Sequence, residues 1–391
     1  MRMQLVLDQI LTRAVANQSI AGAVAMVGQR KGLLYEGAAG VRAVGLPAAM
    51  TTNSTAWLAS LSKVVTTVAV MQCVERGLLD LDAPAANICP TLGTLQVRER
   101  FDEDGQPVLR APKSPITLRQ LLSHSSGLGY ELFHPDVRRE LEQSGKDNVL
   151  SGTRATLERA LVADPGSAWV YSIGIDWAGL MLEAVTGKRL GDYLQAELFT
   201  PLGMTDTGFT LSAEQAARRA SLHARTPDGG LQPIPFELPP EPEVQMGGHA
   251  LFGTAPDYMR FMRMLLNDGS LDGVEILKPA TVADMRRNQI GALDMTPIPT
   301  AMPDFSFPVN LHPDTSCKFG LGGLINTETT PQGRAAGSYA WVGLSNIYFW
   351  VDPTNDITGI VLTQSLPFFD PTVVKVVNDF ERAVYDTTSK P

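Results

Sequence analysis

The chain contains little cysteine, and its three cysteines do not fit the sites that cysteine usually builds. Cys73, Cys89 and Cys317 are an odd number in 391 residues, so they cannot form a disulfide framework. No two of them have the C-x-x-C spacing, so a structural zinc site has no support. We therefore expect buried, unpaired thiols and a reducing compartment.

Long apolar runs are also absent. No stretch reaches the roughly 18 apolar residues that a membrane-spanning helix needs. The first ten residues include Asp8, and they lack both the apolar core and the small-residue cleavage site of a secretory signal. We therefore expect a soluble, cytoplasmic protein with no membrane partner.

Composition and charge exclude further classes of protein. Hydrophobic residues make up 44% and charged residues 19%, which is ordinary for a globular chain and excludes a disordered one. The formal net charge of −9 makes an electrostatic nucleic-acid binder unexpected. The histidines show no H-E-x-x-H spacing, so we expect no metal and no cofactor.

Strand-like segments lie at the two ends of the chain, and helical segments lie between them. Runs of apolar residues, separated by turn residues, predict strands over 21–27 and 33–39, and again over 338–341, 347–351 and 357–363. This order predicts an α/β fold of the α+β type, with helices flanking a sheet built from both ends. We expect residues 1–90 and 315–391 to form the sheet domain and residues 91–314 to form a mainly helical insertion.

The strongest chemical signal is Ser60-Leu61-Ser62-Lys63, at the start of a predicted apolar helix over 60–76. Residues three apart share a helical face, so Lys63 is expected beside the Ser60 hydroxyl. Burial disfavours the ammonium form, and a lysine close to neutrality can take a proton from a serine. Lys63 is the only charged residue between Ser54 and Val74, which argues against the alternative of a helix-capping serine and a surface lysine.

Two later segments carry weaker signals. Tyr171 precedes a predicted helix and could share a proton with a serine, although an ordinary half-buried tyrosine is the alternative. Gly343 follows Trp341 near a strand edge, where a glycine allows a substrate to approach the backbone. The N–H groups of Leu344 and of Ser60, at the helix start, could then bind an oxyanion. The alternative for this strand edge is a simple hairpin turn.

Taken in chain order, these motifs resemble those of the serine β-lactamase fold group. The closest resemblance is to its class C-like branch, which includes family VIII carboxylesterases and the lovastatin-type acyltransferase. The matching segments, which together span most of the chain, are 60–63 with 75–82, 116–128, 171–172, 247–258 and 341–343. The resemblance implies a β-lactamase/transpeptidase-like fold with an antiparallel sheet, and an active site in the cleft between the sheet and the inserted helical region.

The resemblance also implies a role for each matching residue. Ser60 would be the acylated nucleophile, and Lys63 and Tyr171 would be the coupled base and acid. The N–H groups of Ser60 and Leu344 would form the oxyanion hole. The residues expected to bind substrate are Tyr130, Trp341 and Gly343.

Two departures from the family pattern bear on the substrate. Trp341 stands where lactamases carry the lysine of Lys-Thr-Gly, so the cation that attracts a lactam carboxylate is missing. Ile173 replaces an asparagine that would hold the lactam amide. Both changes favour a neutral ester, and slow cleavage of some cephalosporins stays a hypothesis.

We therefore predict a serine carboxylesterase that hydrolyses short-chain or moderately bulky esters through an acyl-Ser60 intermediate. One alternative is an acyltransferase that passes the acyl group to an alcohol, because both reactions use the same acyl-enzyme. A second alternative is an inactive structural protein of the same fold. A Ser-His-Asp hydrolase using His124 has little support, since the chain contains no G-x-S-x-G elbow.

Overall fold

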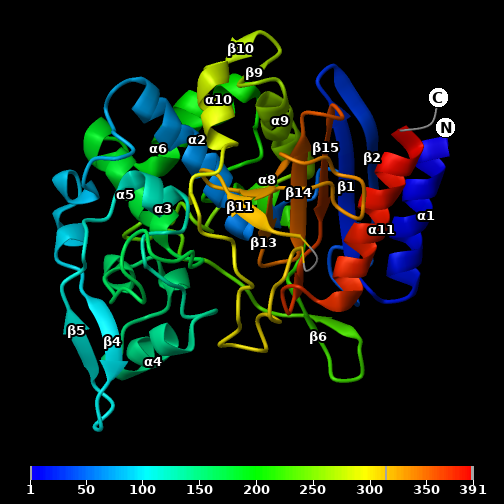
Figure 1. Cartoon of the computed structure of the whole chain (residues 1–391). Coiled ribbons are helices and arrows are strands. Elements are labelled where there is room, and N and C mark those ends of the chain that lie inside the picture. Colours follow the sequence, from blue (N-terminus) through cyan, green and yellow to red (C-terminus); the bar gives the residue numbers. More distant parts are fainter. Residues whose placement is uncertain (1, 313–314, 389–391) are drawn as a thin grey trace.

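The computed structural model describes residues 2–312 and 315–388. Its centre is an antiparallel sheet of seven strands in the order β11-β12-β13-β14-β15-β1-β2 (Figure 1). The strands are β11 (Cys317–Phe319), β12 (Leu324–Asn326), β13 (Tyr339–Gly343), β14 (Ile347–Asp352), β15 (Ile357–Leu362), β1 (Gly22–Gln29) and β2 (Gly32–Gly40). The two ends of the chain thus meet where β1 pairs with β15, and the predicted sheet of terminal segments is confirmed.

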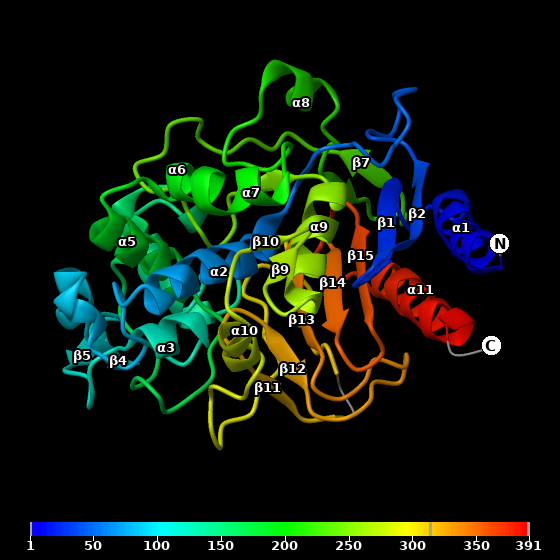
Figure 2. The same cartoon turned by 90° about the horizontal axis from the view of Figure 1, so that it is seen from above.

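Helices from both termini cover one face of this sheet. α1 (Arg2–Ala16) and α11 (Pro371–Thr388) pack against each other, and α1 also packs on β2 (Figure 2). α9 (Ala255–Leu266) packs on β1, β14 and β15. β13, β14 and β15 are buried along their whole length, as expected for strands in the middle of a layered structure.

A buried helix joins the sheet to the helical part of the molecule. In α2 (Ser62–Glu75), every residue from Ser62 to Cys73 is buried, and the helix packs against α5 (Gly174–Thr186). α5 in turn contacts α3 (Leu118–Leu122), which begins with a capping box between Thr117 and Gln120. The predicted helix over 60–76 is therefore present, but its first residues form a separate 3-10 turn, Ala59–Leu61.

Shorter elements complete the molecule. The other helices are α4 (Pro135–Ser144), α6 (Leu190–Leu194), α7 (Thr200–Leu202), α8 (Ala213–Ala217) and α10 (Pro279–Met285). The other strands are β3 (Ala56–Trp57), β4 (Val97–Phe101), β5 (Pro107–Arg110), β6 (His223–Arg225), β7 (Leu231–Pro233), β8 (Phe252–Gly253), β9 (Ser270–Leu271), β10 (Val274–Glu275) and β16 (Ser365–Leu366). α9 lies within the predicted insertion yet packs on the sheet, and the division at residues 91 and 314 stays a prediction.

The structure also bears on the cysteines and on membrane spans. All three cysteines are buried and unpaired, as predicted. None of the helices in the described part of the chain combines the length and the apolar character needed to cross a membrane.

Candidate active site

Ser60 lies on the 3-10 turn Ala59–Leu61, directly before α2. Ala59 has a φ of +47°, a left-handed conformation that a residue with a Cβ seldom adopts. Such strain is retained when the surrounding structure enforces it, and it is common at functional sites. The turn thus separates Ser60 from the regular helix and sets its side chain at the edge of a pocket.

Lys63 lies in the first turn of α2 and is completely buried. Its Nζ donates hydrogen bonds to Ser60 Oγ (3.2 Å), to the Tyr130 hydroxyl (3.0 Å) and to the Gly248 carbonyl (2.7 Å). The i, i+3 spacing therefore brings the amine to the serine, as predicted, although Ser60 is outside the α-helix. The alternative of a surface lysine is wrong.

Tyr171 approaches Ser60 from the loop before α5. Its hydroxyl donates to Ser60 Oγ at 2.7 Å, so the serine oxygen accepts from both the amine and the phenol. The Lys63 Nζ also lies 4.9 Å from the centre of the Tyr171 ring, within the range of a cation–π contact. The structure thus brings together the three residues predicted to be catalytic.

His124 supports the tyrosine segment rather than the serine. Its Nδ1 accepts a hydrogen bond from the Ser172 N–H (3.2 Å), and its ring lies edge-on to Tyr171 with centroids 4.8 Å apart. Burial, reinforced by the Lys63 charge, holds the pKa of His124 well below 6.5, so the imidazole stays neutral.

The predicted oxyanion donors lie on two walls of one pocket. Ser60 and Leu344 both line it, and Leu344 directly follows β13. Gly343, at the end of β13, packs against the serine turn: a Cβ at this position would lie 2.9 Å from the Leu58 carbonyl oxygen. The missing side chain therefore allows the strand to approach Ser60, and the oxyanion role of the two N–H groups stays a prediction.

The pocket beside Ser60 is small and mainly apolar. Its free volume is about 30 Å³. Of the predicted site residues, Ser60, Tyr130, Tyr171, Trp341 and Leu344 are in its wall, whereas Lys63 and Gly343 are not. The remaining wall residues are Trp57, Ala59, Leu132, Phe133, Val149, Leu150, His249, Ile298, Val342 and Phe368. The lining suits an uncharged acyl group.

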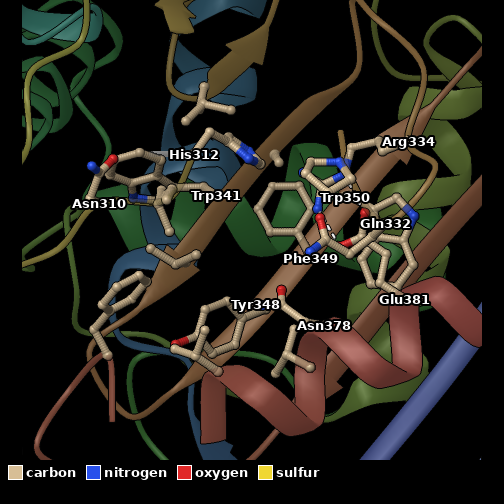
Figure 3. A pocket seen from close by; sticks show the side chains of 18 of the residues that line it. Asn310, His312, Gln332, Arg334, Trp341, Tyr348, Phe349, Trp350, Asn378 and Glu381 are labelled. Carbon is tan, nitrogen blue, oxygen red and sulfur yellow. Dashed lines mark hydrogen bonds and ion pairs between the residues drawn. The ribbon is translucent and has the colours of Figure 1, made fainter. Parts of the chain in front are cut away.

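A larger cavity of about 410 Å³ lies against the sheet next to α11, and Figure 3 shows it from close by. It shares Trp341 and Val342 with the pocket at Ser60 but contains none of the three residues predicted to be catalytic. Its charged groups, Arg334 and Glu381, form a buried ion pair (2.7 Å) and so neutralise each other. The chemistry therefore belongs to the smaller pocket.

Three parts of the site were not predicted from sequence: the contact of Tyr130 with Lys63, the Gly248 carbonyl, and Asp176. Asp176 lies in the first turn of α5, is buried, and accepts a hydrogen bond from the Gly248 N–H at 2.8 Å. Burial raises its pKa to about 6, while the Lys63 charge and the Gly248 N–H act in the opposite direction. Asp176 is the only charged residue between Asp164 and Glu183. The isolation in an apolar stretch that identified Lys63 could have identified Asp176 as well.

This arrangement can perform acyl transfer. The Ser60 oxygen can attack a carbonyl while Lys63 or Tyr171 takes the serine proton and later returns it to a leaving group. His249, also in the pocket wall, is neutral because burial, with the Lys63 charge, lowers its pKa to about 3. Among residues 2–312 and 315–388, no three His, Cys, Asp or Glu side chains gather closely enough to hold a metal ion.

Comparison with known proteins is consistent with this chemistry. The sequence profile described as Beta-lactamase matches residues 7–380. Monacolin J acid methylbutanoyltransferase of Aspergillus terreus is 32% identical over 97% of this chain and 95% of its own length. Lovastatin esterase of Penicillium rubens is 31% identical over 97% of this chain and 98% of its own.

A solved structure extends the similarity to three dimensions. Unliganded simvastatin synthase from Aspergillus terreus superposes with a TM-score of 0.85 at 30% identity, covering 99% of each chain. EstCE1, described as a hydrolase with promiscuous acyltransferase activity, has a TM-score of 0.78 at 24% identity over 98% of each chain, which supports the fold alone. The predicted β-lactamase-like fold is therefore confirmed.

Proposed function

The chain belongs to the beta-lactamase family, and from that premise we propose that it is a serine-dependent acyltransferase that moves a small acyl group from a neutral ester or thioester to an alcohol. The observation that carries the proposal is the buried chain of hydrogen bonds from Lys63 and Tyr171 to the Ser60 oxygen. A nucleophile that two proton carriers contact directly is the arrangement that acyl-enzyme chemistry requires.

In the first half of the reaction, Ser60 Oγ bonds to the acyl carbon and the bond from that carbon to the leaving oxygen or sulfur breaks. The serine proton passes through the Lys63–Tyr171 pair to the leaving group. The N–H groups of Ser60 and Leu344 stabilise the negative charge on the carbonyl oxygen. In the second half, an acceptor alcohol attacks the acyl-enzyme, its proton follows the reverse route, and Ser60 is regenerated.

Two features support acyl transfer over simple hydrolysis as the main activity. The relatives include an acyltransferase, 32% identical, that is similar over nearly the whole chain. The pocket at Ser60 is mainly apolar, so its wall offers contacts to the apolar body of an alcohol and few hydrogen bonds to water. An alcohol with an apolar body would compete well with water in such a pocket.

The test is to acylate the enzyme with a short-chain p-nitrophenyl ester and measure how the acyl group divides between added alcohols and water. We expect an acyl adduct on Ser60 by mass spectrometry, and more new ester than free acid at millimolar alcohol. Ser60→Ala should lose the adduct and fold normally. Ser62→Ala, the neighbouring serine whose hydroxyl donates to the Ala59 carbonyl, should keep it. An adduct that survives in Ser60→Ala would refute the proposal.

Ester hydrolysis is the second candidate, and the similarity to lovastatin esterase favours it. In that case free acid would dominate at every alcohol concentration, while the dependence on Ser60 would be unchanged. The family VIII carboxylesterase assignment and a cytoplasmic location also stay proposals. The replacement of a lactamase lysine by Trp341 leads us to expect little or no cleavage of nitrocefin.

A further inference from the structure

The buried carboxylate of Asp176 is connected to Lys63 through one residue, Gly248. Asp176 Oδ1 accepts from the Gly248 N–H (2.8 Å), and the Gly248 carbonyl accepts from Lys63 Nζ (2.7 Å). The second of these is the shortest of the three hydrogen bonds that Lys63 makes. The position of the amine therefore depends on the position of the Gly248 carbonyl, and Asp176 anchors the same residue.

The packing at Gly248 shows how closely the carboxylate holds this turn. A Cβ on Gly248 would lie 2.7 Å from Asp176 Oδ2 and 2.9 Å from Oδ1, so a side chain here would displace the carboxylate. Asp176 is 1% exposed, and its Oδ2 has no hydrogen-bond partner within the described part of the chain. Burying a charged oxygen without a full set of hydrogen-bond partners destabilises the folded state. If this side chain had only a structural role, a neutral residue would stabilise the turn better.

The charges around Asp176 explain what its carboxylate can do. Lys63 faces it from α2, and His249, held neutral, lies with Nδ1 at 4.0 Å from Oδ1. Arg159 also favours the ionised carboxylate, but its charge is balanced by Glu131 in an ion pair of 2.7 Å. Among the described residues, Lys63 forms no direct ion pair, which leaves Asp176 as the buried negative charge that interacts with it.

We propose that Asp176 is a positioning residue for the acylation step: through Gly248 it aims the Lys63 amine at Ser60, and its negative charge acts on the Lys63–Tyr171 pair that carries the proton. This inference rests on the proposed function of Ser60. A nearby negative charge opposes proton loss from an ammonium and from a phenol alike. The direction of the effect is therefore the same whichever of the two groups gives up the proton.

Two substitutions separate the two parts of this role. Asp176→Asn keeps an oxygen that can accept from Gly248 but removes the charge. We expect kcat to stay within about tenfold of the wild-type value, and the acidic limb of the kcat/KM profile to move to lower pH by about one unit. Asp176→Ala removes the anchor too, so kcat should fall by more than about tenfold with little change in KM.

The control is Asp192→Asn, an exposed carboxylate on α6, which should leave both kcat and the pH profile unchanged. Circular dichroism and unfolding curves establish that each variant is folded. An Asp176→Asn enzyme with a wild-type pH profile would overturn the proposal, whether or not Asp176→Ala folds. A residue with only a structural role would not shift the acidic limb of the kcat/KM profile. If wild-type enzyme gives no adduct on Ser60, it is the proposed function that fails.

Discussion

At the scale of single residues, the two tyrosines of the site have different contacts and should have different effects. The Tyr171 hydroxyl donates to the nucleophile itself, whereas the Tyr130 hydroxyl only accepts from Lys63. Burial, as the largest cause, raises the pKa of Tyr130 well above 10, so this phenol keeps its proton.

We therefore expect Tyr171→Phe to lower kcat for ester turnover by about 10²–10⁴-fold, the usual value of a proton carrier. Tyr130→Phe removes one hydrogen bond to Lys63 and should lower kcat by about tenfold. Single-turnover acylation rates measure both effects. Equal losses in the two variants would contradict the different roles assigned to these phenols.

Asp176 should also affect stability, and in the direction opposite to its effect on activity. Its carboxyl has a pKa of about 6 in the folded protein and 3.8 as an ordinary value, so the folded state binds the proton more tightly. The stabilisation that the Asp176 carboxyl contributes to the folded state is therefore present at low pH and is lost as the pH rises through about 6. The full loss is about 3 kcal/mol.

Asp176→Asn should therefore unfold with a free energy about 1–3 kcal/mol higher than wild type at pH 8, because a neutral amide avoids this cost. Near pH 4 the two proteins should differ little. Denaturant titrations at the two pH values measure the free energy of unfolding of both proteins. The difference between wild type and variant separates the contribution of Asp176 from that of other titrating groups. A difference that does not change with pH would contradict the expectation.

How much of the site could be predicted follows from how its residues are connected. Ser60 and Lys63 are three residues apart, so local spacing and one isolated charge were enough to pair them. Tyr171 carries only a weak signal of its own, and its catalytic role follows from the family resemblance, since nothing local connects it to Ser60. Asp176 carries the same isolated-charge signal as Lys63, but nothing local connects it to Ser60. The Gly248 carbonyl reaches Lys63 only through tertiary packing, and a backbone contact of this kind leaves no residue-type signal.

At the scale of elements, the site depends on how closely β13 approaches the serine turn. Gly343 faces the Leu58 carbonyl, and a Cβ there would lie 2.9 Å from a backbone oxygen that cannot rotate away. Gly343→Ala should move the end of β13, and with it the Leu344 N–H, away from Ser60. We expect kcat to fall by about 10–10³-fold, as for loss of an oxyanion donor, and stability to fall by about 1–3 kcal/mol.

Gly32→Ala is the matched control for this change. Gly32 begins β2 in the same sheet, and a Cβ there meets no atom within 4 Å in the described structure. Activity and unfolding midpoint should stay at wild-type values. Crystal structures or hydrogen exchange of β13 in the two variants would locate any shift, and a fully active Gly343→Ala enzyme would exclude close approach of this strand as a requirement.

The elements themselves were more predictable than their boundaries. The first hairpin and the last three long strands follow their apolar periodicity. The predicted helix over 60–76 starts at Ser62. This difference has a physical cause, since the left-handed Ala59 is imposed by the packing around the serine turn and has no local sequence signal.

At the scale of the whole molecule, the last helix is connected to the segment that leads into β13 by a buried ion pair. Arg334 Nε and Nη2 donate to the two carboxylate oxygens of Glu381 on α11, at 2.9 and 2.7 Å. Both side chains are under a tenth exposed. Such a pair contributes little net stability over apolar residues, but removing one partner leaves a buried charge uncompensated.

Glu381→Gln should therefore lower the free energy of unfolding by about 3–5 kcal/mol. The combined replacement Arg334→Met with Glu381→Leu should recover most of this loss, because it removes both charges. Lys375→Gln breaks an exposed pair with Asp379 on the same helix and should cost under about 1 kcal/mol.

The Arg334–Glu381 ion pair lies in the wall of the larger cavity and outside the pocket at Ser60, so kcat per folded molecule should be unchanged in all three variants. Active-site titration with an acylating ester, combined with unfolding curves, separates the two quantities. A fall in kcat among correctly folded Glu381→Gln molecules would instead mean that the sheet transmits strain from α11 to the serine.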